Sequence, residues 1–154
     1  VLAQYRPGYV LMHCRRGATP GTMQNDPHYD DVVEEVMRFF EERMNAMVKA
    51  GLPEENIILD PGIGFGKPRL GDVQLIAQLP QVLAGLPETA VLVGASRKRV
   101  VGMWCGNPPF EERLPGTLAI HTLAQWNGAH ILRVHDVAPA VQAARVADAC
   151  RRER

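Results

Sequence analysis

The fold of this chain is organised around residues 92–102, which read LVGASRKRVVG. A short apolar run begins near Ala90 and is bounded by Gly94. Three consecutive cations follow at Arg97, Lys98 and Arg99. A run bounded in this way is typical of a buried parallel strand, and it predicts a strand that ends in a cationic loop. Gly94 lets a ligand approach the backbone, and Ser96 is suited to cap a following helix. We therefore expect an anion or a polar ring to bind here; the alternative for three cations in a loop is a solvated surface.

Composition places the chain among ordinary globular proteins of one domain. Its 154 residues are 46% hydrophobic and 22% charged, which suits a sizeable core and argues against disorder or a membrane span. Lys plus Arg number 17, as do Asp plus Glu, so the net charge indicates neither a nucleic acid nor an anionic membrane as partner. Three scattered cysteines without a Cys-x-x-Cys pair favour a reducing, cytoplasmic compartment. The first residues show no signal-peptide pattern, and the opening on Val1 leads us to expect a truncated start.

Apolar runs and helical patterns alternate along the chain. Strands are predicted over residues 9–13 and 56–59, from about 90, and over 130–136. Helices are predicted between 31 and 51 and over 72–83, 117–128 and 137–150, with a short helical turn over 100–105. The first helix opens with a capping box of Asp31 and Glu34 and ends at Gly51. Its apolar residues repeat at helical spacing and are predicted to be core: Val33, Val36, Met37, Phe40, Met44, Met47 and Val48.

This alternation of strand and helix, four times over, predicts a parallel sheet. An open doubly wound sheet and a (β/α) barrel are the two architectures that fit. Polar residues follow all four predicted strands: His13; Asp60; Ser96 with Lys98; and Arg133 with His135. A doubly wound sheet would concentrate its signal on the first glycine loop, so this distribution favours the mouth of a barrel.

The glycine-rich loop at residues 60–69 superficially suggests phosphate binding. Its glycines fit neither the dinucleotide fingerprint nor the Walker pattern, because Lys67 is followed by Pro68. We expect the loop instead to present Phe65 as an aromatic wall beside an inward-pointing Asp60. The alternative for this aspartate is a simple Asp-Pro-Gly turn.

Arg133 and His135 are two residues apart on a predicted strand, so both point to the same face while Asp136 points to the other. An arginine fork beside an imidazole and a helix start suits a diphosphate. The alternative is an arginine paired with a carboxylate such as Asp136. His28, His121 and His130 have no partner at metal-ligand spacing and are interpreted as surface or core histidines. The strand-end loops gather cations into a predicted positive mouth: Arg15, Arg16, Lys67, Arg69, Arg97, Lys98, Arg99 and Arg133.

Four motifs, in this order and spacing, resemble the dihydropteroate synthases of folate biosynthesis: LMH at 11–13, LDPGIGFGK at 59–67, GASRK at 94–98 and RVHDV at 133–137. The resemblance covers the whole chain but only strands five to eight of that family's (β/α)8 barrel. It implies an α/β fold of the TIM-barrel family with about four βα units, a half barrel, in which residues 1–154 are the C-terminal part of one pterin-binding domain. The family's N-terminal half, with its magnesium-binding Asn and further pterin ligands, has no counterpart in these residues.

The resemblance implies a transferase that condenses 6-hydroxymethyl-7,8-dihydropterin diphosphate with p-aminobenzoate, giving 7,8-dihydropteroate and diphosphate. A dissociative departure of diphosphate needs anion stabilisation more than a strong base. By similarity the catalytic residues are Lys98, Arg133 and His135, of which Arg133 and His135 hold diphosphate. The pterin side is formed by Asp60, Met12, Phe65, Gly94 and Lys98, and the p-aminobenzoate side by Ser96, Arg97 and Phe65.

The resemblance also implies Mg²⁺ as cofactor, with its protein ligand in the missing N-terminal half and none in this chain. Sulfonamides are expected inhibitors, and a homodimer is expected, with no nucleic-acid or membrane partner. Two alternatives remain: a pterin-binding methyltransferase domain, and a non-catalytic half-barrel scaffold. The methyltransferase has no diphosphate to hold, and four βα units leave open sheet edges that favour association.

Overall fold

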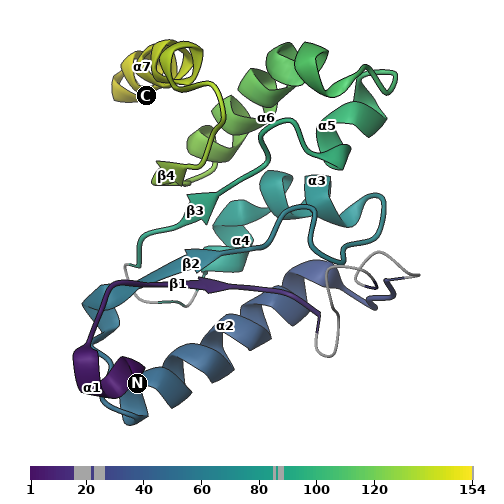
Figure 1. Cartoon of the computed structure of the whole chain (residues 1–154). Helices are drawn as coiled ribbons and strands as arrows, with labels where there is room; N and C mark the ends of the chain where they lie inside the picture. Colours follow the sequence, from purple (N-terminus) through teal and green to yellow (C-terminus); the bar gives the residue numbers. More distant parts are fainter. Residues whose placement is uncertain (16–21, 23–26, 85, 87–88, 154) are drawn as a thin grey trace.

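The computed structural model describes residues 1–15, 22, 27–84, 86 and 89–153 as an α/β structure in which helices connect successive strands (Figure 1). The strands are β1 (Tyr9–Met12), β2 (Ile57–Asp60), β3 (Leu92–Val93) and β4 (Ile131–Leu132). The helices are α1 (Leu2–Tyr5), α2 (Val32–Lys49), α3 (Gly71–Ala77), α4 (Leu79–Leu83), α5 (Arg99–Trp104), α6 (Leu114–Trp126) and α7 (Val137–Arg152), with 3-10 turns η1 (Glu54–Asn56) and η2 (Phe110–Arg113). Within this described part, no helix combines the length and the apolar character needed to cross a membrane.

The strands lie in chain order and run parallel. β1 pairs with β2 from Tyr9 opposite Ile57 to Met12 opposite Asp60, and β3 pairs with β4. A parallel bridge between Leu59 and Val91 joins the two pairs, since the Leu59 N–H donates to the carbonyl of Ala90 at 2.9 Å. All four carboxyl ends therefore point to the same edge, as the alternation of strand and helix predicts.

Helix α2 begins where the sequence predicts and buries the predicted stripe. Oδ1 of Asp31 accepts hydrogen bonds from the N–H groups of Val33 and Glu34, at 2.8 and 3.0 Å. The reciprocal bond comes from Glu35, whose carboxylate accepts from the N–H of Asp30 at 3.2 Å, so the capping partner lies one residue later than predicted. Of the predicted core residues, Val33, Val36, Phe40 and Met44 are buried, Met37 and Met47 are partly buried, and Val48 is exposed.

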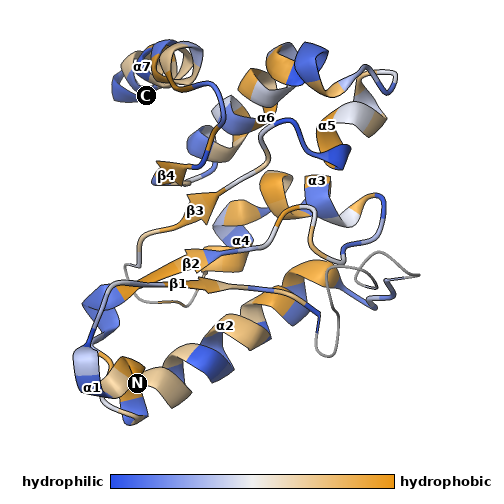
Figure 2. Ribbon diagram, viewed as in Figure 1, coloured by the Kyte–Doolittle hydropathy of each residue, from blue (hydrophilic) through white to orange (hydrophobic). Residues whose placement is uncertain are grey.

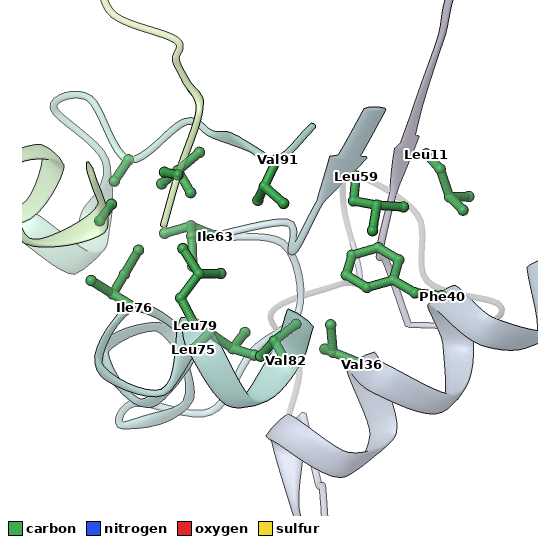
Figure 3. Packing of buried hydrophobic residues seen from close by; sticks show 14 of the residues in the cluster. Leu11, Val36, Phe40, Leu59, Ile63, Leu75, Ile76, Leu79, Val82 and Val91 are labelled. Carbon is green, nitrogen blue, oxygen red and sulfur yellow. The ribbon is translucent and has the colours of Figure 1, made fainter. Parts of the chain in front are cut away.

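The core lies between the sheet and the helices that follow β1 and β2. Figure 3 shows Phe40 and Val36 of α2 pointing toward Leu59 of β2 and Leu11 of β1, with Leu75, Leu79 and Val82 packed alongside. Phe40, Leu59 and Val91 are fully buried. Figure 2 shows the same division: the strands are hydrophobic, and the chain that follows β3 becomes hydrophilic before α5. The apolar strands thus hold the polar loops at one edge of a fixed sheet.

Two elements differ from the predictions. The single helix expected over 72–83 is divided into α3 and α4 at Gln78, because Pro80 in the first turn of α4 has no N–H to continue the helical ladder. The strand expected over 130–136 ends at Leu132, although the Arg133 N–H still donates to the carbonyl of Val93 at 2.9 Å. The side-chain alternation of a strand therefore does not extend to Asp136. The predicted 100–105 turn is α5, and α6 begins earlier than predicted, at Leu114.

Candidate active site

Asp60 is the last residue of β2, and its side chain is nearly buried at the carboxyl edge of the sheet. Its Oδ1 accepts a hydrogen bond from the Gly62 N–H at 2.8 Å, and its backbone carbonyl accepts from the His13 N–H at 2.9 Å. Burial raises the pKa of Asp60, while the Gly62 N–H and the nearby Lys98 charge act in the opposite direction. Among the described residues Gly62 is the one hydrogen-bond donor to this carboxylate. Lone pairs consequently stay available for the N–H groups of a ligand.

The glycine loop that follows Asp60 is held in a conformation that only glycine adopts easily. Gly62 and Gly64 have φ values of 71° and 82°. A Cβ atom on Gly62 would collide with the carbonyl oxygen of His13, so this glycine also permits a close approach of two loops. The Gly64 N–H donates to Oδ1 of the buried Asp72 at 2.7 Å, and the Phe65 N–H donates to the Gly62 carbonyl at 3.0 Å. Hydrogen bonds to a buried carboxylate and within the loop itself therefore fix its conformation.

Lys98 joins this loop to the segment after β3. Its Nζ donates to the carbonyl oxygen of Ile63 at 2.6 Å and lies 4.5 Å from the centre of the Phe65 ring, in cation–π contact. Burial lowers the pKa of Lys98, and the carboxylates of Asp60 and Asp72 raise it. The structure thus brings together the predicted Asp60, Phe65 and Lys98.

Ser96 and His135 meet between the ends of β3 and β4. The hydroxyl oxygen of Ser96 accepts from the His135 N–H at 3.2 Å and lies 2.9 Å from Nδ1 of the same residue. Ser96 is buried, and the His135 ring packs edge-on against Phe110 with 5.6 Å between centroids. Ser96 therefore orients the imidazole from beneath.

Arg97 has a φ of 53° and engages most of its donors within the protein. Its Nε and Nη2 bind the carboxylate of Asp136, and its Nη1 donates to the carbonyls of Phe110 and Glu111, both at 3.1 Å. The Phe110 ring lies beneath the guanidinium at 5.2 Å, and the Arg97 N–H donates to the hydroxyl of Thr117 at 2.9 Å. Phe110, Asp136 and Thr117 position Arg97, and the sequence does not predict this role. No local motif marks residues that meet only after folding.

Arg133 is exposed beside Gly94, where an added Cβ atom would lie 3.5 Å from the Cβ of Arg133. Its charge lowers the pKa of both Asp60 and Lys98, which places it within electrostatic reach of the same site. Arg133 and His135 do not share the predicted strand face, since both residues follow the end of β4. The predicted alternative pair of Arg133 with Asp136 is also wrong, because Asp136 binds Arg97.

The predicted positive mouth loses Lys67, which is completely buried. A charge in the interior cannot contact an anion that enters from solvent. The prediction that Lys67 belongs to the positive mouth is therefore wrong. Arg16 lies outside the described residues. Met12, at the end of β1, pairs in register with Asp60 and is partly exposed. His13 is buried edge-on against Phe39 at 4.8 Å, and burial with the nearby Lys67 charge lowers the pKa of His13 to about 3.

The other histidines are surface or core residues, as interpreted from the sequence. His28 is exposed, whereas His121 on α6 is buried. Nε2 of His121 accepts from the Ala95 N–H at 3.0 Å, and burial together with the Lys98 charge lowers the pKa of His121 to about 4. This ring is neutral at pH 7 and holds the backbone next to Ser96. Nothing in its local sequence distinguished this supporting role.

No three His, Cys, Asp or Glu side chains in the described part of the chain gather so as to hold a metal ion. Arg133, His135 and Lys98 are hydrogen-bond donors suited to an anion rather than to a cation. The described residues therefore do not themselves fit the magnesium ion that the resemblance implies.

A carboxylate that accepts N–H groups, a lysine over an aromatic ring, and an arginine with an imidazole at the next strand end can hold a flat polar ring and an attached anion. Fold and site together define an α/β domain whose candidate ligand site lies at the carboxyl ends of parallel strands. Comparison with known proteins gives a more specific assignment. Residues 1–135 match the model of the family described as pterin binding enzyme, and this chain belongs to that family.

Several similar proteins are named dihydropteroate synthase. The chain is 44% identical to the Escherichia coli K12 dihydropteroate synthase over 140 residues, which cover 90% of this chain and 48% of that protein. A Yersinia pestis dihydropteroate synthase in a sulfonamide drug complex superimposes with a TM-score of 0.92 at 37% identity, covering 99% of this chain and 54% of the other. The Xanthomonas albilineans dihydropteroate synthase in complex with 7,8-dihydropteroate superimposes with a TM-score of 0.85 at 43% identity. The match covers 97% of this chain and 53% of that one. The chain thus spans about half the length of the curated relatives it matches.

Proposed function

We propose that this chain forms the C-terminal part of a dihydropteroate synthase, which condenses 6-hydroxymethyl-7,8-dihydropterin diphosphate with p-aminobenzoate. The observation that carries the proposal is the meeting of Asp60, Phe65 and Lys98 at the ends of β2 and β3. The nearly buried carboxylate accepts from the amino and ring N–H groups of a pterin, and Lys98 donates to the ring. Met12 and Gly94 complete the flat pocket, and the product bound by the Xanthomonas relative supports this ligand class.

The diphosphate is released into the cationic end of the site. The bond between the pterin methylene carbon and the diphosphate oxygen breaks, its electron pair leaves with diphosphate, and the methylene becomes a delocalised cation. Arg133 and His135, which are both exposed, stabilise the departing anion as charge-assisted hydrogen-bond donors do. The amine of p-aminobenzoate then forms the new C–N bond and gives up a proton. Ser96 and Arg97 receive this second substrate, and sulfonamides compete with it.

The remaining half of a (β/α)8 barrel would complete this domain. The described residues form four parallel strands, among which β1 and β4 have no outer strand partner. Beside β4, a groove of about 630 Å³ between α6 and α7 is lined by apolar residues that include Val134, Val137 and Val141. Such an edge suits a further βα unit, and the length of the relatives leaves room for one. We further propose that the magnesium ligand lies in this other half of the barrel. The protein is proposed to be cytoplasmic and to form a homodimer.

The test is diphosphate release from the dihydropterin diphosphate, measured with and without p-aminobenzoate. The chain is assayed alone and together with the N-terminal half of the Escherichia coli relative. We expect release that requires p-aminobenzoate, and Arg133→Ala lowers its rate roughly 10²- to 10³-fold, as the loss of an oxyanion donor does. Arg145→Ala, on the exposed face of α7, is the matched control and leaves the rate unchanged. Absence of release in both mixtures, or release independent of p-aminobenzoate, overturns the proposal.

A further inference from the structure

Lys67 is a fully buried cation with three backbone partners. Its Nζ donates to the carbonyl oxygens of Phe65 at 3.0 Å, Gly62 at 3.2 Å and His13 at 3.5 Å. An ammonium group has three N–H donors, so these contacts match its full donor capacity. With 0% of its surface exposed, the side chain cannot touch a ligand that enters from solvent.

The three carbonyls belong to the segments that shape the pterin side of the site. Two of them lie in the glycine loop, whose Gly62 N–H holds Asp60 and whose Phe65 ring contacts Lys98. The third belongs to His13, directly after β1, and lies against Gly62. Lys67 therefore connects the loop after β1 to the loop after β2 beneath the site.

We propose that Lys67 is a positioning residue of this site, whose buried ammonium fixes the glycine loop and thereby the placement of Asp60 and Phe65 toward a bound pterin. The statement that the ligand is a pterin rests on the proposed function, whereas the effect on the loop does not. The loop has a second internal anchor, since the Gly64 N–H donates to Asp72.

The chemistry of the position favours this role over simple packing. Taking an ammonium out of water is unfavourable, and burial lowers the pKa of Lys67 to about 8, although Asp72, Cys14 and Asp60 act to raise it. Lys98 is the other cation that faces this group and lowers the same pKa. An apolar side chain such as Met fills a similar volume without this cost, but it takes the ammonium donor away from three carbonyls. Among the described residues, only the Gly62 carbonyl then keeps a donor, the Phe65 N–H. The lysine is thus suited to fixing backbone geometry.

The first experiment compares Lys67→Met with Lys49→Met by amide hydrogen exchange. Lys49 ends α2 and is exposed, so its variant controls for the loss of a lysine charge. We expect the amides of Gly62 and Phe65 to exchange roughly tenfold faster in Lys67→Met only, because local opening becomes easier when an anchor is lost. If Lys67→Met does not fold, Lys67→Gln, which keeps two donors, replaces it. Unchanged exchange at both amides overturns the inference, whether or not the protein binds a pterin.

The second experiment measures the dissociation constants of 6-hydroxymethylpterin and p-aminobenzoate. We expect Lys67→Met to weaken pterin binding roughly tenfold and p-aminobenzoate binding less, because the pterin depends on both Asp60 and Phe65, whereas p-aminobenzoate depends on Phe65 alone of these two. A uniform loss of both affinities indicates general destabilisation and contradicts a positioning role. If the unsubstituted protein binds no pterin even together with the N-terminal half of the Escherichia coli relative, the proposed function fails, and the exchange comparison alone decides whether Lys67 fixes the loop.

Discussion

The guanidinium of Arg97 donates two hydrogen bonds to the carboxylate of Asp136. The distance is 2.8 Å from Nε to Oδ2 and 2.7 Å from Nη2 to Oδ1. The pair raises the pKa of Arg97 and lowers the pKa of Asp136, chiefly through these hydrogen bonds. Asp136 immediately follows His135, and Arg97 immediately follows Ser96, which itself contacts His135. The ends of β3 and β4 are thus tied by two adjacent contacts, and they place an imidazole and a guanidinium at one edge.

Replacement of Asp136 by Asn should disturb the p-aminobenzoate binding proposed for Arg97. The amide is neutral and presents one acceptor oxygen to the two donors of Arg97, so the guanidinium loses its fixed orientation. We expect the dissociation constant of p-aminobenzoate to rise roughly tenfold, with a smaller change for the pterin. Titration of each ligand into the protein measures both. Asp30→Asn, at an exposed ion pair with His28, is the control, and equal affinities in the two variants would refute the role given to this contact.

The parts of the site that the sequence predicts lie at the end of a strand or in the short segment after it: Asp60 is the last residue of β2, and Lys98 lies between β3 and α5. Asp60 and Lys98 stand at the ends of apolar runs, and parallel strands place such ends side by side. Phe65 follows from the glycine spacing, which forces a tight loop. These residues therefore come together as expected, although their assigned roles as pterin and p-aminobenzoate ligands stay predictions.

The remaining contacts depend on distances that no local pattern encodes. Arg97 and Asp136 are 39 residues apart in the chain, and either could pair with another charge. Lys67 is buried because its ammonium binds carbonyls of the glycine loop and of His13. The folded backbone brings these carbonyls together, and no side-chain pattern in the sequence marks them. The side-chain direction at Arg133 could not be deduced, because β4 ends at Leu132 and the alternation of a strand ends there.

Gly62→Ala should destabilise the protein more than Gly106→Ala does. Both glycines have positive φ, 71° and 79°, but only at Gly62 would the new Cβ collide with a backbone atom, the carbonyl oxygen of His13. We expect a loss of about 1 kcal/mol at Gly106 from the backbone conformation alone and about 3 to 5 kcal/mol at Gly62 from conformation plus overpacking. Urea unfolding at pH 7 measures both. Similar losses would mean that the loop after β1 moves aside freely.

His121→Gln should reduce the acid sensitivity of the protein. The amide oxygen of Gln can accept the Ala95 N–H as Nε2 does, but it does not titrate. Because the folded pKa of His121 is lowered from 6.5 to about 4, the unfolded chain binds more protons between these values, and stability is lost as pH falls from 6.5 toward 4. Between pH 7 and pH 5 we expect the unsubstituted protein to lose about 2 kcal/mol more than the variant.

Urea titrations of both proteins at pH 7 and pH 5 give this difference directly. His13 has a lowered pKa as well, so both proteins keep a common acid sensitivity that cancels in the comparison. An equal loss of stability in the two proteins would mean that His121 is protonated in the folded state without penalty.

Lys67→Met should remove an alkaline gain in stability. The folded pKa of Lys67 lies near 8, below its ordinary value of 10.5, so between these values the unfolded chain binds more protons and stability rises with pH. We expect the free energy of unfolding to increase by about 2 kcal/mol from pH 8 to pH 10 through this group, and Lys67→Met to lack that increase. Lys49→Met, which removes an exposed lysine, retains it. Urea unfolding at the two pH values decides the matter: parallel behaviour of the two variants would show that the buried ammonium is solvated well enough to keep its ordinary pKa. A difference between them would show instead that burial lowers the pKa of the Lys67 ammonium in the folded protein, at a cost in stability.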